Sequence, residues 1–174
     1  MAAGVSLARS KDHPVVGALA LASEIGSWKS LLALSAGTWG WGMVVRDRRL
    51  ADAGRHMLQA GILASIVKTT LKRTLHRTRP NVLMDEGVYA RGWPGTSVGP
   101  WQSFPSGHSA ISAAVACAAV RVYPEVKGVA YVTAAGVVAV QVVRGAHFPV
   151  DVMAGALIGV AAEATANRLA RSGA

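Results

Sequence analysis

The stretch Lys72-Arg73-Thr74-Leu75-His76-Arg77-Thr78-Arg79-Pro80 follows a long apolar segment and is dense in basic side chains. Lys72 and Arg79 are seven residues apart, about two helical turns, so they share a face if a helix continues through them. Pro80 disfavours helix at the preceding residue and should end the element there. A guanidinium can hold two phosphate oxygens, and an ammonium adds a point charge. Taken alone, the stretch is more typical of a basic cluster that touches lipid phosphates at a membrane surface.

The chain around this stretch is very apolar for its length. Hydrophobic residues make up 52% of the 174 residues, and charged residues only 16%. A soluble domain of this size seldom carries so much apolar surface, so the composition predicts an integral membrane protein. No repeat, low-complexity tract or linker divides the sequence. We therefore expect one domain over residues 1–174, with its core at about 30–169.

The charge balance is strongly basic, with eighteen basic and nine acidic residues and a net charge of +9. Nucleic acid is a common partner for such a chain. Here the basic residues lie between apolar runs, so we expect a membrane and a phosphorylated substrate as partners, and no nucleic acid. Cys117 is the single cysteine, which allows no internal disulfide, and the five histidines are scattered. This pattern predicts no metal site and no cofactor.

Five apolar segments look able to cross a bilayer once flanking polar turns extend them toward the ~20 residues required. Their approximate bounds are Ser30–Val45, Ala53–Leu71, Ser106–Val122, Gly128–Val143 and Val150–Leu169. Backbone groups in lipid must be satisfied internally, so we predict an all-α, polytopic transmembrane helix bundle. The spacing of Gly155 and Gly159 would permit close helix contact. The segment Pro14–Ser27 is short and interrupted by polar residues, and we favour an interfacial helix over a sixth span.

A second motif, Pro105-Ser106-Gly107-His108, precedes one of these apolar segments. Ser106 suits the N-cap of a helix, which leaves the amides of Gly107 and His108 pointing out of the helix start. Such amides bind phosphate together with the helix dipole, and Gly107 lets a ligand approach the backbone closely. His108 is suited to donate a proton to a leaving alkoxide.

The third motif runs from Arg144 to Asp151. His147 and Asp151 flank Pro149, a residue favoured in the first turn of a helix. A carboxylate there can accept one imidazole N–H, fix the tautomer and raise the basicity of the other nitrogen, as a nucleophilic histidine requires. Taken alone, the pattern equally fits an interfacial histidine beside an aspartate that caps a helix.

Up-and-down threading of the five segments places all three motifs on the same side of the membrane. Three basic loops fall on the opposite side: Arg46–Arg49, Arg121–Lys127 and Arg168–Arg171. Basic loops indicate the cytoplasm, so the motifs should face the exterior. Residues 81–104, rich in Gly and Pro with two tryptophans, fit a surface loop with interfacial anchors, a lid over the site, or both.

Together, the three motifs resemble those of the type 2 phosphatidic acid phosphatase family, which shares its site architecture with bacterial class A acid phosphatases and vanadium haloperoxidases. The family pattern has a Lys, six residues and Arg-Pro, matched by Lys72–Pro80. Pro-Ser-Gly-His is matched by Pro105–His108, and His, three residues, Asp by His147 and Asp151. The resemblance covers about residues 30–169.

The third motif departs from the family pattern at one position. The family usually has Ser-Arg six residues before the His, where this chain has Val140 and Gln141. Arg144 lies three residues before His147, and positions 141 and 144 share a face on a helix end. We expect Arg144 to replace the missing guanidinium, with Gln141 as a neutral donor. A weakened or retuned phosphate site is the alternative.

The resemblance implies a two-step reaction that requires no metal. The phosphoryl oxygens would be bound by a set of cations, a hydroxyl and an amide: Lys72, Arg79, Ser106, Gly107 and Arg144. His147, oriented by Asp151, would attack phosphorus to form a phosphohistidine. His108 would protonate the leaving group and then activate water.

These features predict a membrane lipid phosphatase that acts on a phosphomonoester or pyrophosphate, in a bacterial inner membrane with its site facing the periplasm or exterior. Gln141 motivates an alternative, a non-catalytic membrane protein that binds lipid phosphate or isoprenoid phosphate. A vanadate-dependent oxidase is a third hypothesis. Phosphatidate, phosphatidylglycerophosphate, a polyprenyl phosphate or pyrophosphate and a phosphorylated glycolipid all stay open as substrates, as does the oligomeric state.

Overall fold

The computed structural model describes residues 2–172, and this part of the chain is almost entirely helical. The longer helices are α2 (Pro14–Ser23), α3 (Trp28–Val44), α4 (Arg48–Thr74), α6 (Gly107–Val122), α7 (Lys127–Val143) and α8 (Pro149–Ser172). The shorter elements are α1 (Ala2–Leu7), α5 (Pro80–Glu86), the 3-10 helices η1 (Ala8–Ser10), η2 (Glu24–Gly26), η3 (Gly99–Trp101) and η4 (Pro124–Val126), and the strands β1 (His76–Arg77) and β2 (Arg91–Gly92). The predicted all-α class is confirmed.

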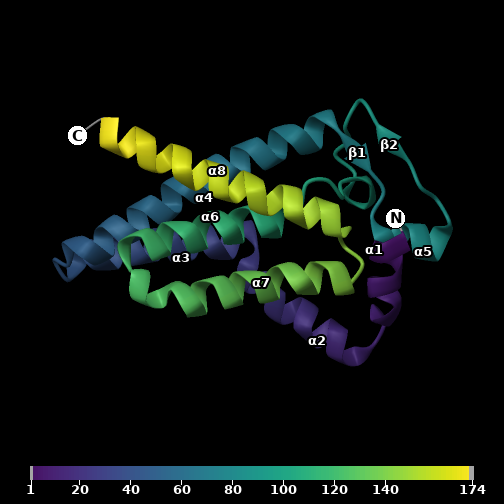
Figure 1. Ribbon diagram of the computed structural model, residues 1–174, viewed down its shortest axis with the longest axis horizontal. Coiled ribbons are helices and arrows are strands. Elements are labelled where there is room, and N and C mark those ends of the chain that lie inside the picture. The colour runs from purple at the N-terminus through teal and green to yellow at the C-terminus, as the bar shows by residue number, and fades with distance from the viewer. Residues whose placement is uncertain (1, 173–174) are drawn as a thin grey trace.

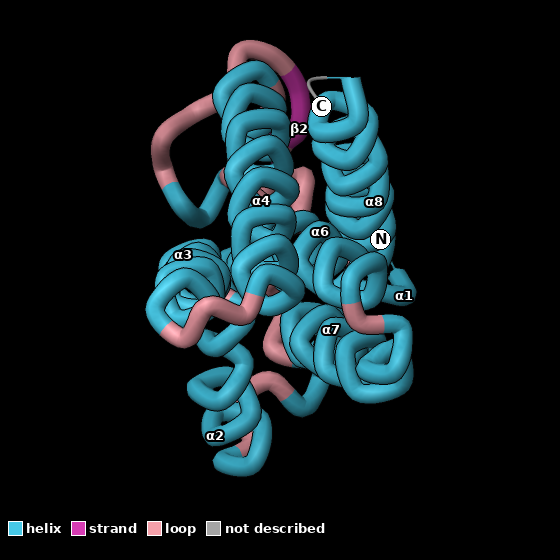
Figure 2. Tube along the Cα trace, turned by 90° about the vertical axis from the view of Figure 1, so that its left-hand side faces the viewer, coloured by secondary structure: helices cyan, strands magenta, loops and turns pink. Residues whose placement is uncertain are grey.

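Helix α6 lies at the centre of the bundle. Figure 2 shows it surrounded by α3, α4, α7 and α8, and it packs against each of them. Its buried face is built largely from small side chains, since Ala110, Ala114 and Ala118 have no exposed surface. Small residues let helix backbones approach closely, which suits a helix enclosed on every side.

Two glycines set the contact between α8 and α6. A Cβ atom on Gly155 would collide with the carbonyl oxygen of Ser106, and one on Gly159 would collide with the carbonyl oxygen of Ala110. The predicted close helix contact at Gly155 and Gly159 is therefore confirmed. Because Ser106 caps α6, this contact fixes the start of α6 beside the start of α8.

By length and composition, two helical segments could cross a membrane: Pro124–Val143 and Pro149–Ser172. A third would be Pro14–Gly26 with Trp28–Val44, a helix pair bent by 44°, if it forms one span. All five predicted segments are helical, but α3 and α6 have only 17 and 16 residues, and α4 carries charges toward both ends. The number of spans stays a prediction, as does the interfacial placement of α2.

Helix α4 ends earlier than the sequence predicts. It stops at Thr74, and the chain then forms β1, which pairs antiparallel with β2. Arg79 has an extended backbone with φ −74° and ψ 153°, and Pro80 begins α5. Proline excludes helix from the residue before it but is well suited to the first helical position. The prediction of a break was correct, but Pro80 starts a helix where we expected it to end one.

The connection over residues 81–104 has more regular structure than a plain surface loop. Figure 1 shows β1, β2, α1 and α5 gathered at one end of the bundle. The amide of Arg79 donates to the carbonyl oxygen of Pro100 (3.0 Å), and the amide of Thr78 donates to that of Ala90 (2.9 Å). These bonds hold the connection against the chain that leaves α4. Its role as a lid stays a prediction.

The other end of the bundle holds an ionic cluster around a buried carboxylate. Glu163 of α8 is 3% exposed and accepts a hydrogen bond from Arg121 of α6, with 2.8 Å between Nη2 and Oε2. Nε2 of His56, on α4, lies 2.9 Å from Oε1 of Glu163. One carboxylate thus joins three helices far along the bundle from the three motifs.

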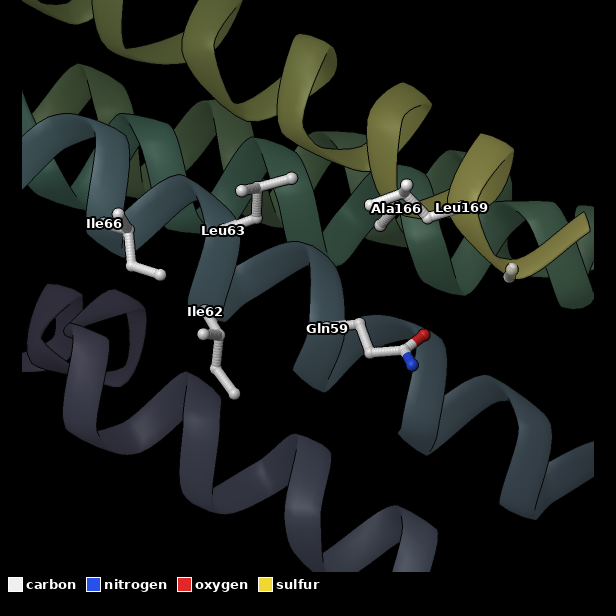
Figure 3. Close-up of a pocket in the computed structure, with 7 residues that line it drawn as sticks. Gln59, Ile62, Leu63, Ile66, Ala166 and Leu169 are labelled. Carbon is white, nitrogen blue, oxygen red and sulfur yellow. The ribbon is translucent and has the colours of Figure 1, made fainter. Parts of the chain in front are cut away.

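An apolar hollow of about 350 Å³ lies between α4 and α8. Figure 3 shows residues that line it, among them Ile62 and Leu63 of α4 and Ala166 and Leu169 of α8. Gln59 supplies the polar side chain there, and none of the lining residues is charged. This composition does not suit a phosphate site.

Candidate active site

A polar pocket of about 470 Å³ opens at the end of the bundle where the three motifs meet. Residues from every motif line it: Lys72, Arg79, Gly107, His108 and His147. The other lining residues are Glu24, Ser27, Trp28, Lys29, Lys68, Gln102 and Ile111. The tertiary structure thus brings together residues that are 75 positions apart in the sequence, from 72 to 147.

The cations of the pocket are fixed by the backbone around them. Nζ of Lys72 donates to the carbonyl oxygen of Gln102 at 2.6 Å. The backbone of Arg79 is held by the hydrogen bond from its amide to the carbonyl oxygen of Pro100, while its buried Nε atom has no hydrogen-bond partner. A buried donor without a partner is costly unless a ligand satisfies it. Arg79 lines the pocket, where its guanidinium can pair with an anion.

Lys68 is a site residue that the sequence analysis missed. It lines the pocket one helical turn before Lys72. A Cβ atom on Gly107 would lie 3.9 Å from the ammonium nitrogen of Lys68, so this cation sits beside the start of α6. The four-residue spacing of Lys68 and Lys72 was the available signal, because it places both lysines on one helix face.

The start of α6 has the predicted N-cap. Oγ of Ser106 accepts a hydrogen bond from the amide of Ser109 at 3.4 Å and another from its hydroxyl at 3.0 Å. Ser106 has no exposed surface and does not line the pocket, so its hydroxyl caps the helix, and its direct contact with phosphate stays a prediction. Gly107 and His108 follow the cap and line the pocket, where the helix dipole favours an anion.

His147 is held in a single tautomer by a backbone carbonyl. Its Nδ1 lies 2.6 Å from the carbonyl oxygen of Ser103, and a carbonyl can only accept, so Nδ1 carries the proton. Nε2 then keeps its lone pair. Burial, followed by the positive charges of Lys72 and Arg79, holds the pKa of His147 well below its usual range. The imidazole is therefore neutral near pH 7, as a nucleophile must be.

Asp151 does not accept the imidazole N–H that the sequence analysis assigned to it. Its carboxylate accepts from Nη1 of Arg77 (2.6 Å), from Oγ of Ser103 (2.5 Å) and from the amide of Phe148 (2.9 Å). Asp151 is the third residue of α8, where a carboxylate naturally reaches back to the amide that precedes the helix. Its link to His147 is indirect, because Asp151 fixes Ser103, whose carbonyl orients the ring.

Arg77 is the second site residue that the sequence analysis missed. Besides its ion pair with Asp151, its guanidinium stacks over the ring of Phe148 with Cζ 4.2 Å from the ring centroid. Its carbonyl oxygen accepts a bond from the amide of Ser103. Arg77 thereby ties β1 to both segments that hold His147. No spacing pattern distinguished it from the other basic residues of its stretch.

The structure overturns the predicted role of Gln141. The side chain is fully buried, Nε2 donates to Oγ of Ser23 in α2 at 3.1 Å, and Gln141 does not line the pocket. Positions 141 and 144 do lie at the end of a helix, but α2 packs against α7 and covers the face that carries Gln141. Gln141 still supports the site through its backbone, since its carbonyl oxygen accepts the amide of His147 at 3.1 Å.

Arg144 is not among the residues that line the pocket. It caps the end of α7, and its Nη1 lies 3.4 Å from Oε1 of Glu24, which does line the pocket. The predicted contact between Arg144 and phosphate therefore requires the guanidinium to exchange Glu24 for the substrate, and this role stays a prediction.

Among residues 2–172, no group of three or more His, Cys, Asp and Glu side chains is arranged to hold a metal ion.

The profile of a family described as "PAP2 superfamily" matches residues 53–171, more than half of the chain. The chain belongs to the PAP2 superfamily. This membership agrees with the resemblance drawn from the three motifs, and the match includes every motif residue named above.

Two curated relatives are named "Lipid A 1-phosphatase". The protein from Rhizobium johnstonii is 28% identical over 138 residues, which are 76% of this chain and 56% of the relative. The one from Rhizobium etli is 28% identical over 136 residues, which are 75% of this chain and 58% of the relative. The chain thus spans a little over half the length of these two relatives.

A solved structure shares the fold. The crystal structure of Aquifex aeolicus LpxE superposes with a TM-score of 0.62 and 18% identity, covering 95% of this chain and 92% of that one. At this identity the likeness establishes a shared helical fold, including the elements outside the residues that the family profile matches.

Proposed function

We propose that the chain is a lipid phosphatase that hydrolyses a phosphorylated lipid through a phosphohistidine intermediate, without a metal. The observation that carries this proposal is the state of His147. Its Nδ1 proton is committed to Ser103, which leaves Nε2 as a nucleophile in a pocket shared with Lys72, Arg79 and His108. A neutral imidazole facing cations and a second histidine suits attack on a phosphoryl group.

In the first step, Nε2 of His147 attacks phosphorus and an N–P bond forms. The bond from phosphorus to the ester oxygen breaks, and its electron pair stays on that oxygen. His108 donates a proton to the oxygen, so the lipid alcohol leaves as a neutral product. Lys68, Lys72 and Arg79 stabilise the charge on the transferring group.

In the second step, water attacks the phosphohistidine and the N–P bond breaks. His108, now neutral, accepts a proton from the water. Inorganic phosphate leaves, and both histidines return to their starting states. The cations that bound the ester also stabilise this transition state, so the cycle closes with groups of this chain alone.

An apolar hollow beside the pocket offers a place for the lipid chain. It measures about 230 Å³ and is lined by side chains of α3, α4, α6 and α7 together with η2. The two spaces meet at η2, because Glu24 lines the polar pocket while Ile25 and Gly26 line the apolar hollow. A lipid phosphate could place its head and its chain in these adjoining spaces.

The first substrate to test is a glycolipid 1-phosphate, because the two PAP2 relatives carry the name lipid A 1-phosphatase. Phosphatidate, phosphatidylglycerophosphate and polyprenyl phosphates belong in the same panel. We also propose an inner-membrane location with the pocket facing the periplasm, on the basis of basic loops at the opposite end of the bundle.

The test is release of inorganic phosphate from this panel by the protein purified in detergent, with and without a chelator. We expect release from at least one lipid, unchanged by the chelator and inhibited by vanadate. Binding of lipid phosphates without turnover would instead support the non-catalytic alternative that Gln141 motivated. Activity lost in chelator and restored by a divalent ion would contradict the metal-free scheme.

A further inference from the structure

A carboxylate lies among the cations of the pocket. Glu24, in η2, is the single acidic side chain among the described residues that line it, where Lys29, Lys68, Lys72 and Arg79 are also found. An anion placed here weakens the attraction of the pocket for phosphate. The reaction described above gives Glu24 no role.

The position of Glu24 is fixed by its own turn. Its carbonyl oxygen accepts the amide of Ser27 at 2.9 Å and the hydroxyl of Ser30 at 3.0 Å. The turn also packs tightly on the bundle, because a Cβ atom on Gly26 would lie 3.1 Å from Oγ of Ser112. The backbone is therefore held, while the Glu24 side chain is 52% exposed and free to meet a ligand.

Two distances locate the carboxylate relative to the reaction. Oε1 of Glu24 is 3.6 Å from Nε2 of His108 and 3.4 Å from Nη1 of Arg144. Nε2 of His108 is itself buried without a hydrogen-bond partner. The leaving oxygen must lie within hydrogen-bond reach of His108, about 3 Å, to take its proton. Glu24 is therefore next to the group attached to that oxygen, on the far side of phosphorus from His147.

We propose that Glu24 selects the leaving group: it accepts hydrogen bonds from a hydroxyl or amide next to the ester oxygen, as on a sugar ring, and disfavours a leaving group that is itself a phosphate. This inference rests on the proposed phosphatase function and narrows its substrate class to phosphomonoesters of polyhydroxylated head groups.

The selection follows from charge and hydrogen bonding. Hydrogen bonds to an ionised acceptor are among the strong ones, so a neutral donor next to the ester oxygen gains from Glu24. A diphosphate ester would place its second phosphate near the carboxylate, where like charges repel at short range. A plain polyprenyl alcohol offers no donor and gains nothing. Trp28, also on the rim, adds an apolar ring surface suited to a head group.

The experiment compares wild type, Glu24→Gln and the control Glu125→Gln. Glu125 is an exposed glutamate that pairs with Arg49 at the other end of the bundle. For each protein, kcat/KM is measured on an acylated glucosamine 1-phosphate and on a polyprenyl diphosphate in the same detergent. We expect Glu24→Gln to lose about tenfold to a hundredfold on the sugar phosphate. It should hold or gain activity on the diphosphate, and Glu125→Gln should match wild type on both.

If Glu24→Gln lost the same factor of kcat/KM on both substrates, Glu24 would act through His108 or Arg144, and the proposal would be overturned. Wild-type kcat/KM for Glu24→Gln on both substrates would overturn it as well. A second arm needs no turnover. Calorimetry measures binding of glucosamine 1-phosphate and inorganic pyrophosphate, and Glu24→Gln should shift the ratio of the two affinities toward pyrophosphate. If wild type hydrolyses no lipid, the phosphatase function fails, while an unchanged binding ratio would separately overturn the role of Glu24.

Discussion

Asp151 and Glu163 are two buried carboxylates on the same helix, α8, twelve residues or about 18 Å apart. They are 0% and 3% exposed, and each is paired with an arginine from another element. Their remaining partners differ. Asp151 also holds Ser103 and the amide of Phe148, on either side of His147, whereas Glu163 also binds His56 on α4.

The difference teaches that the same pairing of charges serves two purposes. At the pocket end, the carboxylate organises segments that orient a reactive imidazole. At the other end, it joins helices α4, α6 and α8. Removing a carboxylate should therefore lower catalysis at one end and stability at the other.

The largest effect is expected for Asp151→Asn. Loss of the charge leaves the half-buried Arg77 without its counterion and frees Ser103, so the His147 ring loses its fixed direction. Because misplacement of a reacting group by about 1 Å can cost 10²-fold, we expect kcat/KM to fall by about 10²- to 10³-fold. The exposed residue Asp85 provides the control, as Asp85→Asn. If kcat/KM of Asp151→Asn stayed within tenfold of wild type, Asp151 would not be needed to position His147.

The matched change at the other end is Glu163→Gln. The change leaves Arg121 and His56 without their charged partner, and because the Arg121 side chain is 39% exposed and screened by solvent, we expect a cost of about 1–3 kcal/mol. We expect a clear drop in Tm in detergent, with kcat/KM per folded molecule within about twofold of wild type. A large loss of kcat/KM at unchanged Tm would show that the two carboxylates are not divided between catalysis and stability.

A smaller effect is expected for Ser103→Ala. This change removes the hydroxyl bonded to Asp151 but keeps the carbonyl that holds His147. One hydrogen bond to a charged group is lost, so we expect kcat/KM to fall about tenfold with a small change in Tm. The combined Ser103→Ala and Asp151→Asn variant should lose little more than Asp151→Asn alone. If the double variant lost the product of the two single losses in kcat/KM, Asp151 would not act on His147 through Ser103.

The smallest effect concerns pH. The neutral form of His147 is the nucleophile, and its lowered pKa keeps that form populated well below pH 6.5. Activity dependent on His147 should be lost only as pH falls through this low pKa. Lys72→Gln removes a positive charge, so the pKa of His147 should rise and the acid limb of kcat/KM should move to higher pH. NMR titration of the imidazole checks this directly, with Lys127→Gln at the far end as control. A limb that stays in place or moves to lower pH would contradict the electrostatic account.

The sequence predicted most of the fold and the location of the site. Apolar runs identified five of the longer helices, α3, α4, α6, α7 and α8, because burial in a bundle demands continuous apolar faces. The order of the motifs along alternating helices brought Lys72, His108 and His147 to one end. Gly155 and Gly159 predicted a helix contact, since only glycine admits the carbonyls of α6 so closely.

The remaining details depend on tertiary contacts that no local pattern contains. Asp151 has the spacing to reach His147, yet Arg77 and Ser103 arrive from distant segments and take its oxygens. Gln141 shares a face with Arg144, but α2 covers that face. Glu24 lies 84 residues before His108, so the sequence around neither residue indicates that they meet in the pocket.

The central claim is that His147 carries the phosphoryl group through Nε2. The most direct measurement is mass spectrometry of the His108→Ala variant after brief reaction with an aryl phosphate, whose leaving group needs no protonation. The first step should then proceed while water attack is slowed, so phosphate should accumulate on Nε2 of His147 and be absent in His147→Ala. Phosphate on another residue, or phosphate release that persists in His147→Ala, would contradict the account.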